Sequence, residues 1–181
     1  MDHDSAICPH ATTITGRTRK NIGQLALVAI GNSLIEKDRA GLSFLSAAKG
    51  ADICRIPLGV HTVMIADILK SHNCVVILDA LHMEENLEDS AFGHMTIKLD
   101  KNVITKNSLK LEFSHGISFM DELRFYFDNE SIIEQDLYFF GIASTLSDKQ
   151  KRTAAMDELE ALIESLTQEQ KPTISKGAHH A

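Results

Sequence analysis

The chain has 181 residues, of which 44% are hydrophobic, so it can bury one sizeable core and is expected to form a single domain. Its formal net charge is -7 and it has no basic stripe, which argues against a nucleic-acid-binding protein, because Lys and Arg must neutralise phosphates. No apolar run reaches the roughly 18 residues that a membrane-spanning helix needs, so we expect no membrane span.

The cysteines indicate the cellular compartment. Cys8, Cys54 and Cys74 are odd in number, widely spaced and without a CxxC pair, so a disulfide framework is not expected. Cys54 and Cys74 lie inside apolar runs, where a reduced thiol behaves as a small core residue. The N-terminus has no apolar segment of the signal-peptide type. These features predict a protein of the reducing cytoplasm.

The two ends of the chain differ in character from its middle. Residues 1–22 are polar and aperiodic, which predicts a flexible N-terminal arm, and residues 167–181 read as a polar tail. His179 and His180 in that tail lack a rigid frame and are interpreted as solvated. We expect one α/β domain over residues 23–166.

Strand and helix patterns alternate within this domain. Continuous or alternating apolar runs predict strands, and apolar residues at helical spacing predict helices, whereas residues 103–113 are ambiguous. The predicted strands are 25–30, 52–56, 74–78, 94–99 and 137–142, and the predicted helices are 37–49, 62–70, 117–127 and 148–166. Such alternation predicts a three-layer α/β sandwich, in which a mostly parallel twisted sheet has helices on both faces.

Three polar residues follow three of the apolar runs. Asp38 comes after LALVAIGN, Asp79 closes CVVILD, and His115 lies in EFSHG. Because the carboxyl ends of parallel strands line one crevice, we expect these side chains to converge there. Two carboxylates and an imidazole suit a divalent transition metal ion such as Zn, Ni, Mn or Fe.

Each residue also has a structural explanation when taken alone. Asp38 could satisfy amides at a helix start, Asp79 could make buried hydrogen bonds, and His115 could be an ordinary loop histidine. Three ligand-type residues at the same end of three segments favour a joint role.

The ordered motifs resemble those of the hydrogenase maturation proteases, which trim the C-terminus of the large subunit of nickel-iron hydrogenases. LALVAIGNSLIEKDRAG is similar to the family's first strand, Gly-Asn turn and acidic loop, and VVILDAL to the strand that ends in its central aspartate. SHGISFMDELRF and DLYFFGIAS complete the order, over roughly residues 24–166.

The resemblance implies that Asp38, Asp79 and His115 bind metal and serve the catalytic reaction, and that Gly31 and Asn32 bind the substrate. It implies an endopeptidase whose partner is the hydrogenase large-subunit precursor. Nickel already inserted in that precursor, or another divalent metal at the same site, would be recognised by the three side chains. The metal either activates a water molecule or only docks the substrate, and both versions stay open.

The sequence also departs from the family's pattern. Lys37 replaces the first acid of the loop and Arg39 follows Asp38, residues 55–60 replace an Asp-Gly-Gly-Thr turn, and Gly141-Ile142 is followed by Ala143-Ser144 instead of proline. Two alternatives stay open, and these departures favour the first of them. One is a non-catalytic accessory protein that binds the large subunit or nickel without cleavage. The other is an unrelated α/β enzyme that uses the same crevice for a small molecule.

Overall fold

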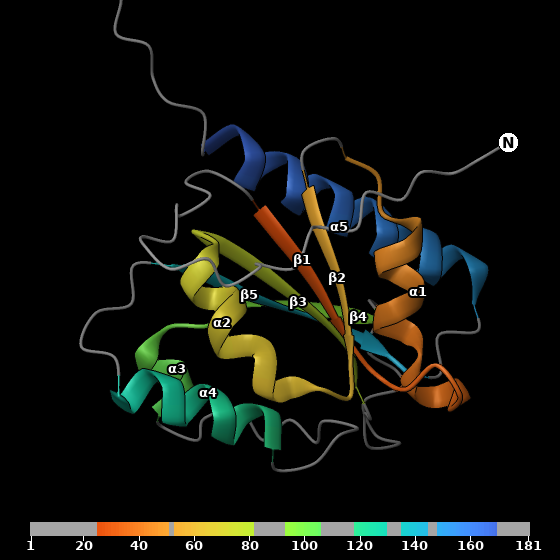
Figure 1. The fold of residues 1–181 in the computed structure, drawn as a ribbon. Helices are drawn as coiled ribbons and strands as arrows, with labels where there is room; N and C mark the ends of the chain where they lie inside the picture. The colour runs from red at the N-terminus through yellow and green to blue at the C-terminus, as the bar shows by residue number, and fades with distance from the viewer. Residues whose placement is uncertain are drawn as a thin grey trace, which may run out of the picture.

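A five-stranded sheet lies at the centre of the described part of the chain (Figure 1). The computed structural model describes residues 25–50, 53–81, 93–105, 118–129, 135–144 and 148–169. The strand order is β2-β1-β3-β5-β4, and all neighbouring pairs are parallel except β4 and β5. The strands are β1 (Leu25–Ile30), β2 (Ile53–Gly59), β3 (Cys74–Leu81), β4 (His94–Lys98) and β5 (Asp136–Ala143). The predicted mostly parallel sheet is confirmed.

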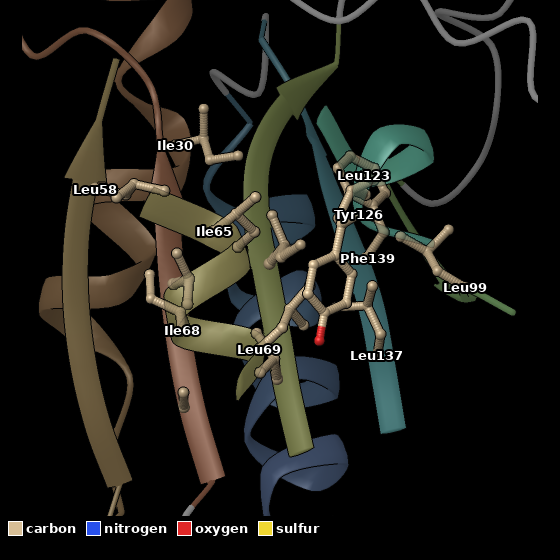
Figure 2. Close-up of a cluster of buried hydrophobic side chains, with 14 of the residues drawn as sticks. Ile30, Leu58, Ile65, Ile68, Leu69, Leu99, Leu123, Tyr126, Leu137 and Phe139 are labelled. Carbon is tan, nitrogen blue, oxygen red and sulfur yellow. The ribbon is translucent and has the colours of Figure 1, made fainter. Parts of the chain in front are cut away.

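Helices cover both faces of this sheet, as the alternation predicts. Side chains of β3 point alternately to the two faces, so Val75 and Ile77 belong to one core cluster and Val76 and Leu78 to the other. The first cluster packs against α2 (Ile65–Ser71), α3 (Lys101–Thr105) and α4 (Ser118–Asn129). The second packs against α1 (Ala40–Ala47) and α5 (Lys149–Glu169). Figure 2 shows the first cluster, in which Ile65 and Leu69 of α2 and Tyr126 of α4 lie over the strands.

β2 is longer than the sequence predicts. The predicted strand ends at Ile56, whereas the observed one continues through Pro57 to Gly59. Proline lacks the N–H that a central strand needs, but β2 is an edge strand, so Pro57 can stand opposite Ala29 without breaking the sheet. The segment that departs from the family's turn, residues 55–60, is therefore mostly strand.

Other boundaries also differ from the prediction. The predicted helix 37–49 is divided into a 3-10 turn, η1 (Glu36–Asp38), and α1, and a second 3-10 turn, η2 (Thr62–Met64), precedes α2. β3 runs past Asp79 to Leu81, and α5 extends to Glu169, beyond the expected start of the tail. Within the described residues no helix combines the length and apolarity that crossing a membrane requires.

The exposed edge at β4 carries a charged pair. The Lys98 Nζ lies 2.6 Å from the Asp136 Oδ1 of neighbouring β5. The hydrogen bond and the charge of Asp136 raise the pKa of Lys98 above its usual value of 10.5. A lysine on an edge strand also discourages pairing with another sheet.

Candidate functional site

Asp38 is held at the carboxyl end of β1 by the loop that follows this strand. It lies in η1 and is 3% exposed, and its Oδ2 accepts a hydrogen bond of 2.8 Å from the N–H of Asn32. Gly31 permits this close approach, because its φ is +138° and a Cβ at that position would overlap the carbonyl oxygen of Asp38. The position of the Asp38 carboxylate is therefore set by the backbone just after β1 as well as by the start of α1.

The rest of this loop is also hydrogen-bonded. The Asn32 Oδ1 accepts from the N–H of Leu34 at 3.0 Å, which is the geometry of an Asx turn. The Gly31 N–H donates to the Gly59 carbonyl at 3.1 Å, and this bond joins the ends of β1 and β2. Gly31 and Asn32, the predicted substrate-binding residues, thus first of all shape the loop.

Asp79 lies inside β3 and is fully buried, at 0% exposed. Its Oδ1 accepts a hydrogen bond of 2.7 Å from the N–H of Ala80, and it stands opposite Gly141 of β5. Strand alternation directs its side chain to the face of Ile77 and Leu81, which is the face that α4 covers. The prediction that β3 ends at this aspartate was wrong by two residues, because β5 continues to pair with β3 as far as Leu81.

The start of α1 links the carboxyl-terminal parts of β1 and β3, which are the parts of the sheet nearest to Asp38 and Asp79. A Cβ at Gly41 would lie 2.6 Å from the Leu78 carbonyl oxygen and 2.8 Å from that of Ile30. The first turn of α1 therefore rests on the carboxyl ends of both β1 and β3, and η1 contacts β3 as well. The elements that carry the two aspartates are therefore in contact, and the convergence of the side chains themselves stays a prediction.

The third predicted ligand, His115, lies outside the described residues, three positions before α4 begins. Over the ranges that the structure does describe, no group of three or more His, Cys, Asp or Glu side chains could hold a metal ion. This result does not include His115, so the metal-binding trio stays a prediction.

The two cations beside Asp38 face solvent. The Arg39 Nη2 lies 3.7 Å from the Glu36 Oε1, and both side chains are exposed. Lys37 is exposed as well. An exposed charge is strongly screened by water, so these departures from the family's pattern place little positive charge against the buried carboxylate.

Two glycines support the site, and the sequence offered little sign of their roles. Gly41 admits the close contact between α1 and the two strand ends described above. A Cβ at Gly141, opposite Asp79, would overlap the side chain of Leu81. Only their position in otherwise regular elements, where glycine is unfavourable, could have drawn attention to them.

Comparison with known proteins identifies the fold. By sequence, no family model and no curated protein matches the chain. By structure, the hydrogenase maturating endopeptidase HybD from E. coli matches with a TM-score of 0.58 and 16% identity, covering 81% of this chain and 93% of that one. The [NiFe] hydrogenase maturation protease HybD from Thermococcus kodakarensis matches with a TM-score of 0.59 and 19% identity, covering 80% and 99%.

The chain therefore has the fold of the hydrogenase maturation endopeptidases, along nearly the whole length of these two structures. The resemblance drawn from the ordered sequence motifs is confirmed at the level of the fold. At 16% and 19% sequence identity, the similarity is one of backbone fold. The roles of individual residues are therefore argued from this chain itself.

Proposed function

We propose that the chain is a maturation endopeptidase, which removes the C-terminal extension from the nickel-loaded large-subunit precursor of a [NiFe] hydrogenase in the cytoplasm. The observation that carries this proposal is the pair of buried carboxylates, Asp38 and Asp79, at the carboxyl-terminal side of the central strands. The chain around them has the fold of hydrogenase maturation endopeptidases. The fold supplies the reaction class, and the pair supplies a reason for acting on a metal-bearing substrate.

Each of the two buried carboxylates, Asp38 and Asp79, carries the cost of its lost hydration. A divalent cation brought by the substrate offsets both costs, and carboxylate oxygens are suitable ligands for it. The nickel is thus part of the substrate, and the buried pair recognises a precursor that is already loaded.

Each side chain has a defined task in this proposal. The backbone N–H of Asn32 orients the carboxylate of Asp38, and the backbone N–H of Ala80 orients that of Asp79. Both carboxylates are therefore in position before the substrate binds. His115 supplies the third ligand. Of the two residues predicted to bind substrate, Gly31 is buried and Asn32 is half-buried, so Asn32 is the one that can contact the precursor.

The test combines cleavage and binding. Purified chain is incubated with nickel-loaded precursor, and mass spectrometry follows loss of the C-terminal extension. We expect cleavage by the wild type and a fall in kcat/KM of about 100-fold or more in Asp79→Asn and in His115→Ala, because each variant removes one of three ligands. Asp67→Asn, an exposed carboxylate on α2, is the matched control and should cleave normally.

The outcomes separate the alternatives. An unchanged precursor mass with an active control protease would contradict the endopeptidase. Stable binding of the nickel-loaded precursor without cleavage would favour the accessory protein that binds the large subunit. Full activity of Asp79→Asn would contradict the assigned site while leaving the reaction class intact.

A further inference from the structure

Large apolar side chains are exposed on two neighbouring loops, the first of which carries Asp38. Among the described residues, six large hydrophobic side chains are exposed, and five of them lie on the two loops that follow β1 and β2. The sixth, Phe125, lies on α4, which contacts η2. We call the five the apolar loop surface: Leu34 (92% exposed), Ile35 (52%), Val60 (54%), Val63 (74%) and Met64 (42%).

Hydrogen bonds hold these loops in place. The Gly31 N–H joins the first loop to Gly59 at the start of the second, and the Ile35 N–H donates to the Asn32 carbonyl at 3.0 Å. In the second loop, the Met64 N–H donates to the His61 carbonyl at 3.3 Å. Thr62 is buried beneath its exposed neighbours, so the loop is anchored to the core. The apolar side chains are therefore presented outward by a fixed backbone, which is expected of a preformed binding surface.

The first of these loops also carries Asp38 of the candidate site. Leu34 and Ile35 lie between Asn32 and Asp38, whose hydrogen bond closes the same loop. We propose that the apolar loop surface docks an apolar segment of the precursor polypeptide while its metal engages the buried carboxylates. The inference rests on the proposed function and names the part of the chain that recognises the protein portion of the substrate.

Local charge favours an apolar peptide over other occupants. Glu36 and Arg39 pair with one another, so Lys37 is the one exposed charge of the first loop that is left unbalanced. A membrane surface rich in anionic lipid would call for a cluster of basic residues there. A second copy of the chain bound to this surface would cover the loop that carries Asp38, and would keep the substrate away from that residue.

The experiment compares two pairs of polar substitutions. The double variant Leu34→Ser with Val63→Ser changes the two most exposed members of the surface. The matched control, Ala154→Ser with Ala161→Ser, changes exposed apolar residues of α5, which lies outside both loops. All four positions are exposed, so circular dichroism and thermal unfolding should match the wild type. Cleavage of the nickel-loaded precursor gives KM and kcat, and light scattering gives the oligomeric state.

We expect the Leu34, Val63 variant to raise KM about tenfold with kcat unchanged, as loss of an apolar docking contact requires, and the control to behave as the wild type. An unchanged KM in a variant that still cleaves would overturn the docking surface and leave the peptidase standing. A fall in kcat alone would overturn it too, since the loop would then act on site geometry. Dissociation of a wild-type dimer by the substitutions would assign the surface to a second copy. If the wild type neither binds nor cleaves the precursor, the proposed function itself fails.

Discussion

Gly41 shows how a residue without a side chain can determine the geometry of a site. The nearest atoms to a Cβ at this position are the carbonyl oxygens of Leu78 and Ile30, which belong to two strands of the sheet. Backbone atoms within a paired sheet cannot rotate away as a flexible side chain can. The absence of a side chain therefore allows α1 to lie directly on both strand ends, and η1 with Asp38 follows from that position.

We predict that Gly41→Ala destabilises the protein by about 2 kcal/mol or more. Alanine favours a helix by about 1 kcal/mol over glycine, but at 2.6 and 2.8 Å its methyl group would force α1 away from the sheet. Urea unfolding measures the difference. Ser46→Ala, at an exposed position of the same helix, is the control and should change stability by less than about 0.5 kcal/mol. A Gly41→Ala protein as stable as the wild type would show that the helix can shift at little cost.

Arg55 explains part of the altered segment in β2. Its Nη2 donates to the carbonyl of Ala48 at 3.0 Å and to that of Gly50 at 3.1 Å. Both carbonyls lie just after the last turn of α1, where unsatisfied acceptors and the helix dipole favour a cation. The departure from the family's turn thus gives this chain a strand residue that closes the end of a helix.

We predict that Arg55→Gln lowers the free energy of unfolding by about 1–2 kcal/mol, because two charge-assisted hydrogen bonds to the helix end are lost. Arg39→Gln is the matched control. It removes an arginine whose partner, Glu36, is exposed, and exposed pairs contribute about 0–1 kcal/mol. Guanidinium chloride unfolding of both variants tests the difference, and equal effects would mean that the Arg55 contacts contribute nothing beyond an ordinary surface charge.

Over the whole molecule, stability is expected to be greatest at the centre of the sheet. β1 and β3 have strands on both sides, and all their residues are buried. β4 is an edge strand whose residues are half-buried or exposed. Asp79 lies within β3 and Asp38 in the turn after β1, so both candidate site residues are carried by rigid parts of the sheet.

Hydrogen exchange followed by mass spectrometry tests this gradient. We predict that amides of β1 and β3 exchange only through global unfolding, and that those of β4 exchange at least about tenfold faster through local opening. Amides of α5 should exchange at rates between those of β3 and β4, since one face of that helix is buried. Protection of β4 equal to that of β3 would show that the sheet opens as one unit.

Local sequence patterns predict the type and order of the main strands and helices, and the layers that they form. Runs such as LALVAI are apolar at every position because both faces of their strand are covered, and the spacing of Leu159, Ile163 and Leu166 defines the buried side of α5. These patterns are local, so they can be read without knowing what packs against them. Asp79 was identified because it interrupts such a run, and Asp38 because it lies in the turn region that follows one.

The order of the strands, the antiparallel direction of β4 and the extension of β2 through Pro57 on an edge strand are visible in the three-dimensional fold alone. The same holds for the hydrogen bond from Asn32 to Asp38 and for the seat of Gly41 on two strand ends. These features depend on contacts between segments far apart in the chain. The free energy of such a contact depends on both segments that form it, so it cannot be predicted from either stretch of sequence alone.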